Sequence, residues 1–142
     1  MKKLVHLNFI IVFLFIAISH TPIKPDVRVI DYLGKEKVDF IQKKNPELIR
    51  YYNFFLDNAY TISTVPTDKL INNDFPTLNL PLKNGKVDTK SLNILKLNIQ
   101  RKYDEAIYYK IKNSDEIIVF LSEKDFMVKY NKHREELGLI KK

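Results

Sequence analysis

Cysteine is absent from this chain of 142 residues, and glycine occurs only three times. The lack of cysteine excludes disulfide scaffolds, cysteine metal sites, thiol nucleophiles and the lipoprotein route that acylates a cysteine. The scarcity of glycine argues against a glycine-rich loop that cradles a phosphate. The folded chain must therefore be stabilised by its core alone.

Histidine is scarce, at positions 6, 20 and 133, and none of the three belongs to a metalloprotease or nucleophile motif. His133 lies between Lys132 and Arg134 in a charged segment, where a surface or boundary position is typical. The carboxylate pairs Asp104-Glu105 and Asp115-Glu116 fall at predicted turns. We therefore predict no catalytic residue, no metal ligand and no cofactor. An enzyme with an unfamiliar carboxylate site is the least favoured hypothesis.

Arginine is also rare, with four residues among 24 basic ones, although the formal charge is +7. Proteins that bind nucleic acid usually rely on arginine forks and clustered basic faces. The lysines here are scattered among Asp and Glu, which is typical of a solvated surface. We predict no nucleic-acid partner. Peripheral attraction to an anionic membrane surface stays open.

The N-terminus has the pattern of an export signal. Lys2 and Lys3 precede an apolar run over residues 4–18, and Ala17-Ile18-Ser19 offers small residues for a cut before His20. A secretory signal needs about 7–15 apolar residues, whereas a membrane span needs about 20. We predict a cleaved signal peptide at 1–19 and a mature chain in the periplasm or at the periplasmic face of the outer membrane. The alternative is an uncleaved inner-membrane anchor through residues 4–18.

Residues 20–33 are expected to form an extended linker or a short strand, and residues 34–142 a single domain. Within it, Asn45-Pro46-Glu47 has the pattern of a helix start. The helical spacing of apolar residues on both sides predicts two consecutive helices, or one kinked helix, over about 35–58. Residues 61–65 are rich in β-branched side chains and predict a short strand before Pro66.

Residues 66–90 form a proline-punctuated stretch without sustained periodicity, which predicts a long loop. The alternating Leu78, Leu80 and Leu82 within it could lie on a sheet or on a partner. Whether this loop is ordered without a partner is left open.

Three strands are predicted in the second half, over 95–100, 106–112 and 116–121, and the last is apolar on both faces and therefore central. Ser122 to Asp125 resembles a capping box, and Gly138 fits the end of the helix that follows. The predicted fold class is α+β, with a small antiparallel sheet. A three-strand meander and one or two short strands form this sheet, and the N-terminal kinked helix and the C-terminal helix pack on one face.

Aromatic residues are concentrated between Tyr51 and Tyr60. The helical stripe of this segment predicts core, which leaves Tyr51, Phe54 and Tyr60 as either core or interface. The candidate interface residues are Tyr51, Phe54, Tyr60, Phe75, Leu78, Leu80 and Tyr108.

These features predict a non-catalytic, exported accessory protein of a bacterial cell envelope that binds a protein partner. The expected setting is the periplasmic side of an outer-membrane secretion or assembly complex, which no motif specifies. The alternative is a small ligand- or glycan-binding module that uses a tyrosine-rich surface. The sequence identifies neither the partner nor the oligomeric state.

Overall fold

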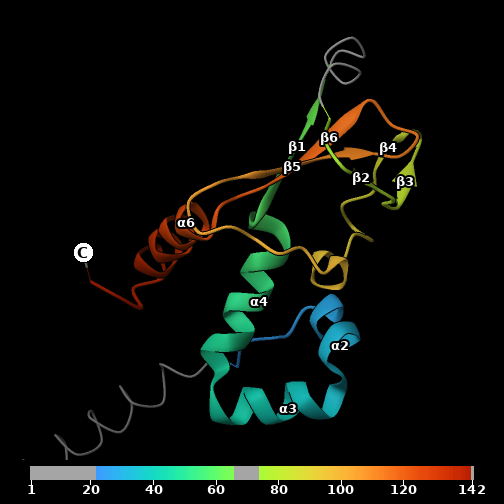
Figure 1. The fold of residues 1–142 in the computed structure, drawn as a ribbon. Coiled ribbons are helices and arrows are strands. Elements are labelled where there is room, and N and C mark those ends of the chain that lie inside the picture. Colours follow the sequence, from blue (N-terminus) through green and yellow to red (C-terminus); the bar gives the residue numbers. More distant parts are fainter. Residues whose placement is uncertain (1–21, 66–73, 142) are drawn as a thin grey trace, which may run out of the picture.

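The computed structural model describes residues 22–65 and 74–141, and the predicted leader lies outside them. The helices are α2 (Val27–Leu33), α3 (Lys35–Lys44), α4 (Pro46–Asn58), the short 3-10 helix η1 (Ile94–Leu97) and α6 (Glu123–Glu136). The strands are β1 (Tyr60–Thr64), β2 (Thr77–Leu78), β3 (Leu82–Lys83), β4 (Lys86–Val87), β5 (Ile107–Ile111) and β6 (Glu116–Phe120). The predicted α+β class is confirmed, and Figure 1 shows α2, α3 and α4 gathered at one end of the sheet.

The two consecutive helices predicted over 35–58 are confirmed as α3 and α4. Pro46 is the first residue of α4, where its missing N–H costs nothing. Asn45 ends α3 through its backbone amide, which donates to the Ile41 carbonyl at 2.7 Å, but its side chain makes no capping hydrogen bond.

Both ends of α6 follow the local sequence signals. The Ser122 hydroxyl accepts from the Asp125 amide at 3.0 Å and donates to the Asp125 carboxylate at 2.8 Å. Gly138 adopts a φ of +70° after the last turn, a conformation that glycine takes without steric cost.

The expectation of an extended linker or strand over 20–33 is wrong for residues 27–33, which form α2. The Asp26 side chain caps this helix by accepting from the Arg28 amide at 2.8 Å, and Gly34 ends it with a φ of +83°. These caps outweigh the strand propensity of the β-branched residues between them. Ile23 also packs against the core, so the folded unit begins before residue 34.

The main sheet has the strand order β1-β6-β5-β2, and β6 is internal as predicted. The pairs β1–β6 and β5–β6 are antiparallel, whereas β2 runs parallel to β5. The sheet is therefore mixed rather than purely antiparallel, because β2 arrives on β5 through a long connection instead of a hairpin. Part of the predicted loop 66–90 thus joins the sheet, and Asn84-Gly85 turns the separate β3–β4 hairpin.

The prediction of a strand over 95–100 is wrong, so the predicted three-strand meander is reduced to the hairpin of β5 and β6. Residues 94–97 form η1, and the chain leaves it through Asn98 in a left-handed conformation with a φ of +50°. The side-chain oxygen Oδ1 of Asn93 accepts from the Leu95 backbone amide. The side-chain nitrogen Nδ2 of Asn93 donates to the Arg28 backbone carbonyl at 2.9 Å. This contact with a distant helix fixes a turn where the local alternation favours a strand.

The core is one cluster of buried side chains from the helices, the sheet and the segment between β2 and η1. The C-terminal helix packs mainly on α4 rather than across the sheet, through Phe126 and Tyr130. Over residues 22–65 and 74–141, no helix is both long and apolar enough to cross a membrane.

Candidate interaction surface

The two faces of the main sheet have different surroundings. Because side chains alternate along a strand, the register divides them into two sets. One set belongs to the core or packs against it: Tyr60, Ile62, Tyr109, Ile111, Ile118 and Phe120. The other set lies outside the core cluster: Thr61, Ser63, Thr77, Tyr108, Lys110, Ile117 and Val119. We call the second set, with Phe75, the open face; Ile117 at its centre is buried with 8% of its surface exposed, whereas Thr61, Ser63, Thr77 and Tyr108 around it are exposed.

Two aromatic rings lie together on the open face. The parallel register between β2 and β5 continues backwards to place Phe75 beside Tyr108. The amides of Lys110 and Lys112 hold this register by donating to the Pro76 and Leu78 carbonyls, both at 2.9 Å. The rings of Phe75 and Tyr108 stack at a centroid distance of 5.4 Å and an angle of 19°. Tyr108 keeps 42% of its surface exposed, so the pair presents an aromatic surface to solvent.

Tyr51 and Phe54, two other candidate interface residues, contact α6. Tyr51 meets Tyr130 edge to face at 5.3 Å, and Phe54 stacks on His133 at 4.5 Å. Burial is the main cause that raises the pKa of the Tyr51 phenol. Both side chains are half-buried by this helix pair, which leaves them little surface for a partner.

The remaining candidates also turn inward. Tyr60 and Leu80 are buried in the core with 8% and 5% of their surface exposed. Leu78 lies on the same face of the sheet as Ile111 and packs against the core. Of the residues proposed from the sequence, we therefore retain only the stacked pair of Tyr108, which is exposed, and Phe75, which is partly exposed.

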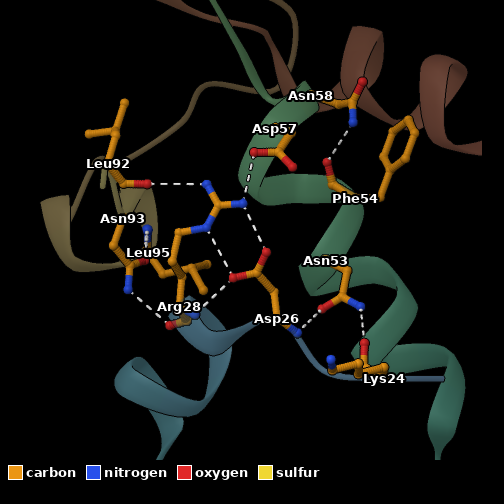
Figure 2. Close-up of polar contacts among 10 residues, drawn as sticks. All are labelled: Lys24, Asp26, Arg28, Asn53, Phe54, Asp57, Asn58, Leu92, Asn93 and Leu95. Carbon is orange, nitrogen blue, oxygen red and sulfur yellow. Dashed lines mark hydrogen bonds and ion pairs between the residues drawn. The ribbon is translucent and has the colours of Figure 1, made fainter. Parts of the chain in front are cut away.

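A polar network that the sequence patterns did not reveal joins the N-terminal segment to the rest of the domain (Figure 2). The Arg28 guanidinium donates twice to the Asp26 carboxylate, at 3.0 and 2.9 Å, and once to Asp57 at 2.9 Å. It also donates to the Leu92 carbonyl at 3.3 Å. These hydrogen bonds lower the pKa of Asp26 and raise the pKa of Arg28. The network links α2, α4 and the chain before η1, so its role is structural.

Asn53 completes this attachment. Its side chain accepts from the Asp26 amide at 2.9 Å and donates to the Lys24 carbonyl at 2.8 Å. The Gln42 side chain donates in the same way to the Ile23 carbonyl at 2.6 Å. The chain is thus fixed to the domain from about residue 23 onward.

A small cavity of about 200 Å³ lies between α2, α4, η1 and β6, with Arg101 as its only charged lining residue. Arg101 donates to the Leu121 and Ser122 carbonyls at 3.0 and 2.7 Å, and its guanidinium lies over the rings of Phe55 and Phe126. Burial lowers its pKa. The Arg101 guanidinium thus donates to the two carbonyls that join β6 to α6. The cavity is also smaller than typical ligand pockets of about 300–1,000 Å³.

The titratable groups considered for chemistry are dispersed. Glu116 is buried and accepts from the Val87 amide at 2.8 Å, which attaches the β3–β4 hairpin to β6. Glu105 pairs with Lys102 in solvent, and this partner lowers the pKa of the carboxyl. Within the part of the chain that the structure describes, no group of three or more His, Asp or Glu side chains could hold a metal ion.

The signal that could have separated Tyr108 from the other aromatic residues is strand phase. Tyr108 and Tyr109 are adjacent on a strand and must face opposite sides, and Tyr109 takes the inner one. Comparisons with protein-family models, with curated proteins and with solved structures find no match for this chain. Its function is therefore inferred from its own sequence and geometry.

Proposed function

We propose that this chain is an exported, non-catalytic accessory protein of a bacterial cell envelope that binds a protein partner through the open face of its sheet. The stacked pair of the partly exposed Phe75 and the exposed Tyr108 carries this proposal. Aromatic residues are enriched at protein interfaces, where they bury large rigid surfaces at low cost in side-chain entropy.

The chemistry around the pair defines the partner surface that would fit it. Thr61, Ser63 and Thr77 supply uncharged polar groups, and Lys110 supplies a positive charge on the same face. The complementary partner is a protein with an apolar patch rimmed by acidic side chains.

The proposed location follows from the leader. The predicted cut after Ser19 lies four residues before Ile23, whose carbonyl accepts a hydrogen bond from Gln42. If the leader is retained instead, this connection reaches at most about 14 Å, so the domain would be held next to the inner membrane. Intact-mass measurement of the native protein distinguishes the two forms, since only the anchored form contains residues 1–19.

The test is quantitative capture of the partner from envelope extracts. The wild type is compared with the double variant Phe75→Ser/Tyr108→Ser and with Phe40→Ser as the matched control. Phe40 is an aromatic residue of α3 that is 62% exposed and remote from the open face. We expect one protein to be captured in stoichiometric amount by the wild type and by Phe40→Ser, but not by the double variant.

Binding is then repeated with the purified partner, so that indirect capture is excluded. Equal affinity of the double variant and the wild type would refute the open face as the binding surface. Failure of the wild type to retain any protein at native expression levels would count against an accessory role altogether.

The stacked aromatic pair also supports the alternative, a small ligand- or glycan-binding module. Sugar rings stack on aromatic faces, and Thr61 and Thr77 offer hydroxyl groups on the same side of the sheet. Under this alternative, a glycan or metabolite raises the melting temperature of the wild type but not that of Phe75→Ser/Tyr108→Ser. Flat results over a broad panel would leave the protein partner as the better proposal.

A further inference from the structure

Among the residues that the structure describes, the strand β1 forms one edge of the main sheet and pairs only with β6. Its hydrogen-bonding phase is set at both ends. The Leu121 amide donates to the Ala59 carbonyl at 2.9 Å, and the Val65 amide donates to the Asp115 carbonyl at 3.1 Å. Residues 59, 61, 63 and 65 therefore direct their backbone groups to β6. The amides and carbonyls of Tyr60, Ile62 and Thr64 point outward from the sheet.

These outward groups have no backbone or side-chain partner among the described residues. Natural edge strands are usually protected by lysine, proline, a bulge or a covering element. The edge β1 has none of these within Tyr60–Thr64, whose sequence YTIST carries no charge. Thr61, Ser63 and Thr64 are exposed, Ile62 is partly exposed and Tyr60 is buried, so an approaching strand meets little obstruction between Thr61 and Thr64.

We propose that two copies of this chain pair along β1 in an antiparallel, two-fold arrangement, which joins their sheets into one continuous sheet. The two-fold axis passes between the two Ile62 residues. This places Ile62 opposite Ile62, Tyr60 opposite Thr64, and Thr61 opposite Ser63 of the second copy. Ile62 thereby gains an aliphatic cross-strand neighbour, and the exposed Thr61 and Ser63 bring two hydroxyl groups together.

Only this register pairs the outward backbone groups of Tyr60, Ile62 and Thr64 with extended residues of the second copy. Centring the pair on Thr64 would bring Ile62 opposite Pro66, which has no N–H to donate. Centring it on Tyr60 would bring Ile62 opposite Asn58, which belongs to α4 and is not extended. The absence of charge also favours a second copy, because identical strands that carried lysine would repel each other.

Self-association requires no external partner, so it is measured independently of the proposed function. Sedimentation equilibrium of the exported protein should show a mass that rises from one to two chains between about 1 µM and 1 mM. A single-chain mass throughout this range would overturn the proposal.

The register is tested with cysteine variants, which the cysteine-free chain makes unambiguous. Thr61 and Ser63 of the second copy would form a pair that exchanges no hydrogen bonds, with Cα atoms about 4.5 Å apart, within disulfide range. Two copies of the same position would lie diagonally, about 7–8 Å apart. An equimolar mixture of Thr61→Cys and Ser63→Cys should therefore form the mixed disulfide in preference to either homodimer. Statistical or preferential homodimers would refute this register.

A charge exchange provides the second test. In Thr61→Lys/Ser63→Lys, like charges oppose each other twice across the pair, and the dissociation constant should rise about tenfold. In the matched variant Thr61→Lys/Ser63→Glu, opposite charges meet, and association should be retained or strengthened. Equal weakening in both variants would mean that the two positions do not face each other, which would overturn the arrangement.

Discussion

The α4–α6 helix pair and the main sheet differ in how much of their apolar and hydrogen-bonding surface is covered within the chain. Aromatic side chains of α4 find partners on α6, and Arg101 covers their ring faces. The sheet buries one face in the core but leaves the open face and the outer groups of β1 without a described partner. Both regions are rich in aromatic or β-branched residues, but only the sheet has such residues left for intermolecular contact.

This difference shows that aromatic density alone does not identify an interface. The segment Tyr51–Tyr60 has the highest density, and its aromatic rings are half-buried or buried. Phe75 and Tyr108 are far apart in the sequence, and only the pairing of β2 with β5 brings them together. We expect substitutions in the helix pair to affect mainly stability, and substitutions on the open face to affect mainly binding.

The largest effect on stability is expected at Phe126. It is fully buried and contacts Tyr51 and Phe55. Phe126→Ala should lower the free energy of unfolding by about 3–5 kcal/mol, because it removes a large apolar side chain and leaves a cavity. Urea denaturation measures this loss. Val128→Ala on the same helix is the control, since Val128 is 66% exposed and should change stability by less than about 0.5 kcal/mol.

A smaller loss is expected at Arg28, since its removal leaves the Asp26 carboxylate without its ion-pair partner. Arg28→Ala should cost about 1–3 kcal/mol. Arg50→Ala is the control, because Arg50 forms a single pair with Glu47 on α4 and should cost less than about 1 kcal/mol. Equal losses would mean that the network in Figure 2 does not attach the N-terminal segment.

The stabilisation lost in Arg28→Ala is expected to depend on pH. Arg28 lowers the pKa of Asp26 in the folded state, so the stabilisation is complete above the unfolded pKa of about 4. It is lost as the pH falls through the lower folded pKa. The stability difference between the wild type and Arg28→Ala should therefore be constant near neutral pH and shrink below about pH 4. A difference that grows on acidification would contradict this assignment.

The helix cap of α6 is expected to contribute less. Ser122→Ala removes the side-chain acceptor for the Asp125 amide and should cost about 1–2 kcal/mol. Ser91→Ala is the control for loss of a hydroxyl group alone, because the Ser91 hydroxyl is exposed and bonds only to Asp88. It should lower the stability less than Ser122→Ala does. Thermal unfolding distinguishes the two variants.

The smallest change in stability is expected on the open face. Tyr108→Ser breaks the stack with Phe75 and should cost about 0.5–1.5 kcal/mol. Circular dichroism should show an unchanged fold. A loss comparable to that of Phe126→Ala would place Tyr108 in the core and remove the distinction between the two regions.

Features coded within a few residues could be predicted from the sequence. The break at Asn45-Pro46 and the cap at Ser122 depend on neighbouring groups. Strand phase also placed Tyr108 and Tyr109 on opposite faces. These features depend on residues close in sequence, so they form regardless of where the segment lies in the fold.

The errors arise where distant contacts decide the conformation. The segment 95–100 alternates like a strand, but Asn93 binds Arg28 and fixes a 3-10 turn instead. The pairing of β2 with β5 could not be predicted either, because it spans more than thirty residues. The stacked pair at Phe75 and Tyr108 depends on that pairing, so the composition of the candidate surface became clear only from the structure.

The most direct test of the difference between the two regions is the amount of partner captured by Phe75→Ser/Tyr108→Ser relative to Phe40→Ser. Both variants lose exposed aromatic surface, but only the double variant alters the open face. We predict that the double variant retains about a tenth or less of the partner that Phe40→Ser retains, as expected when central aromatic contacts of an interface are removed. Equal capture by two folded variants would contradict the assignment of the open face as the interaction surface.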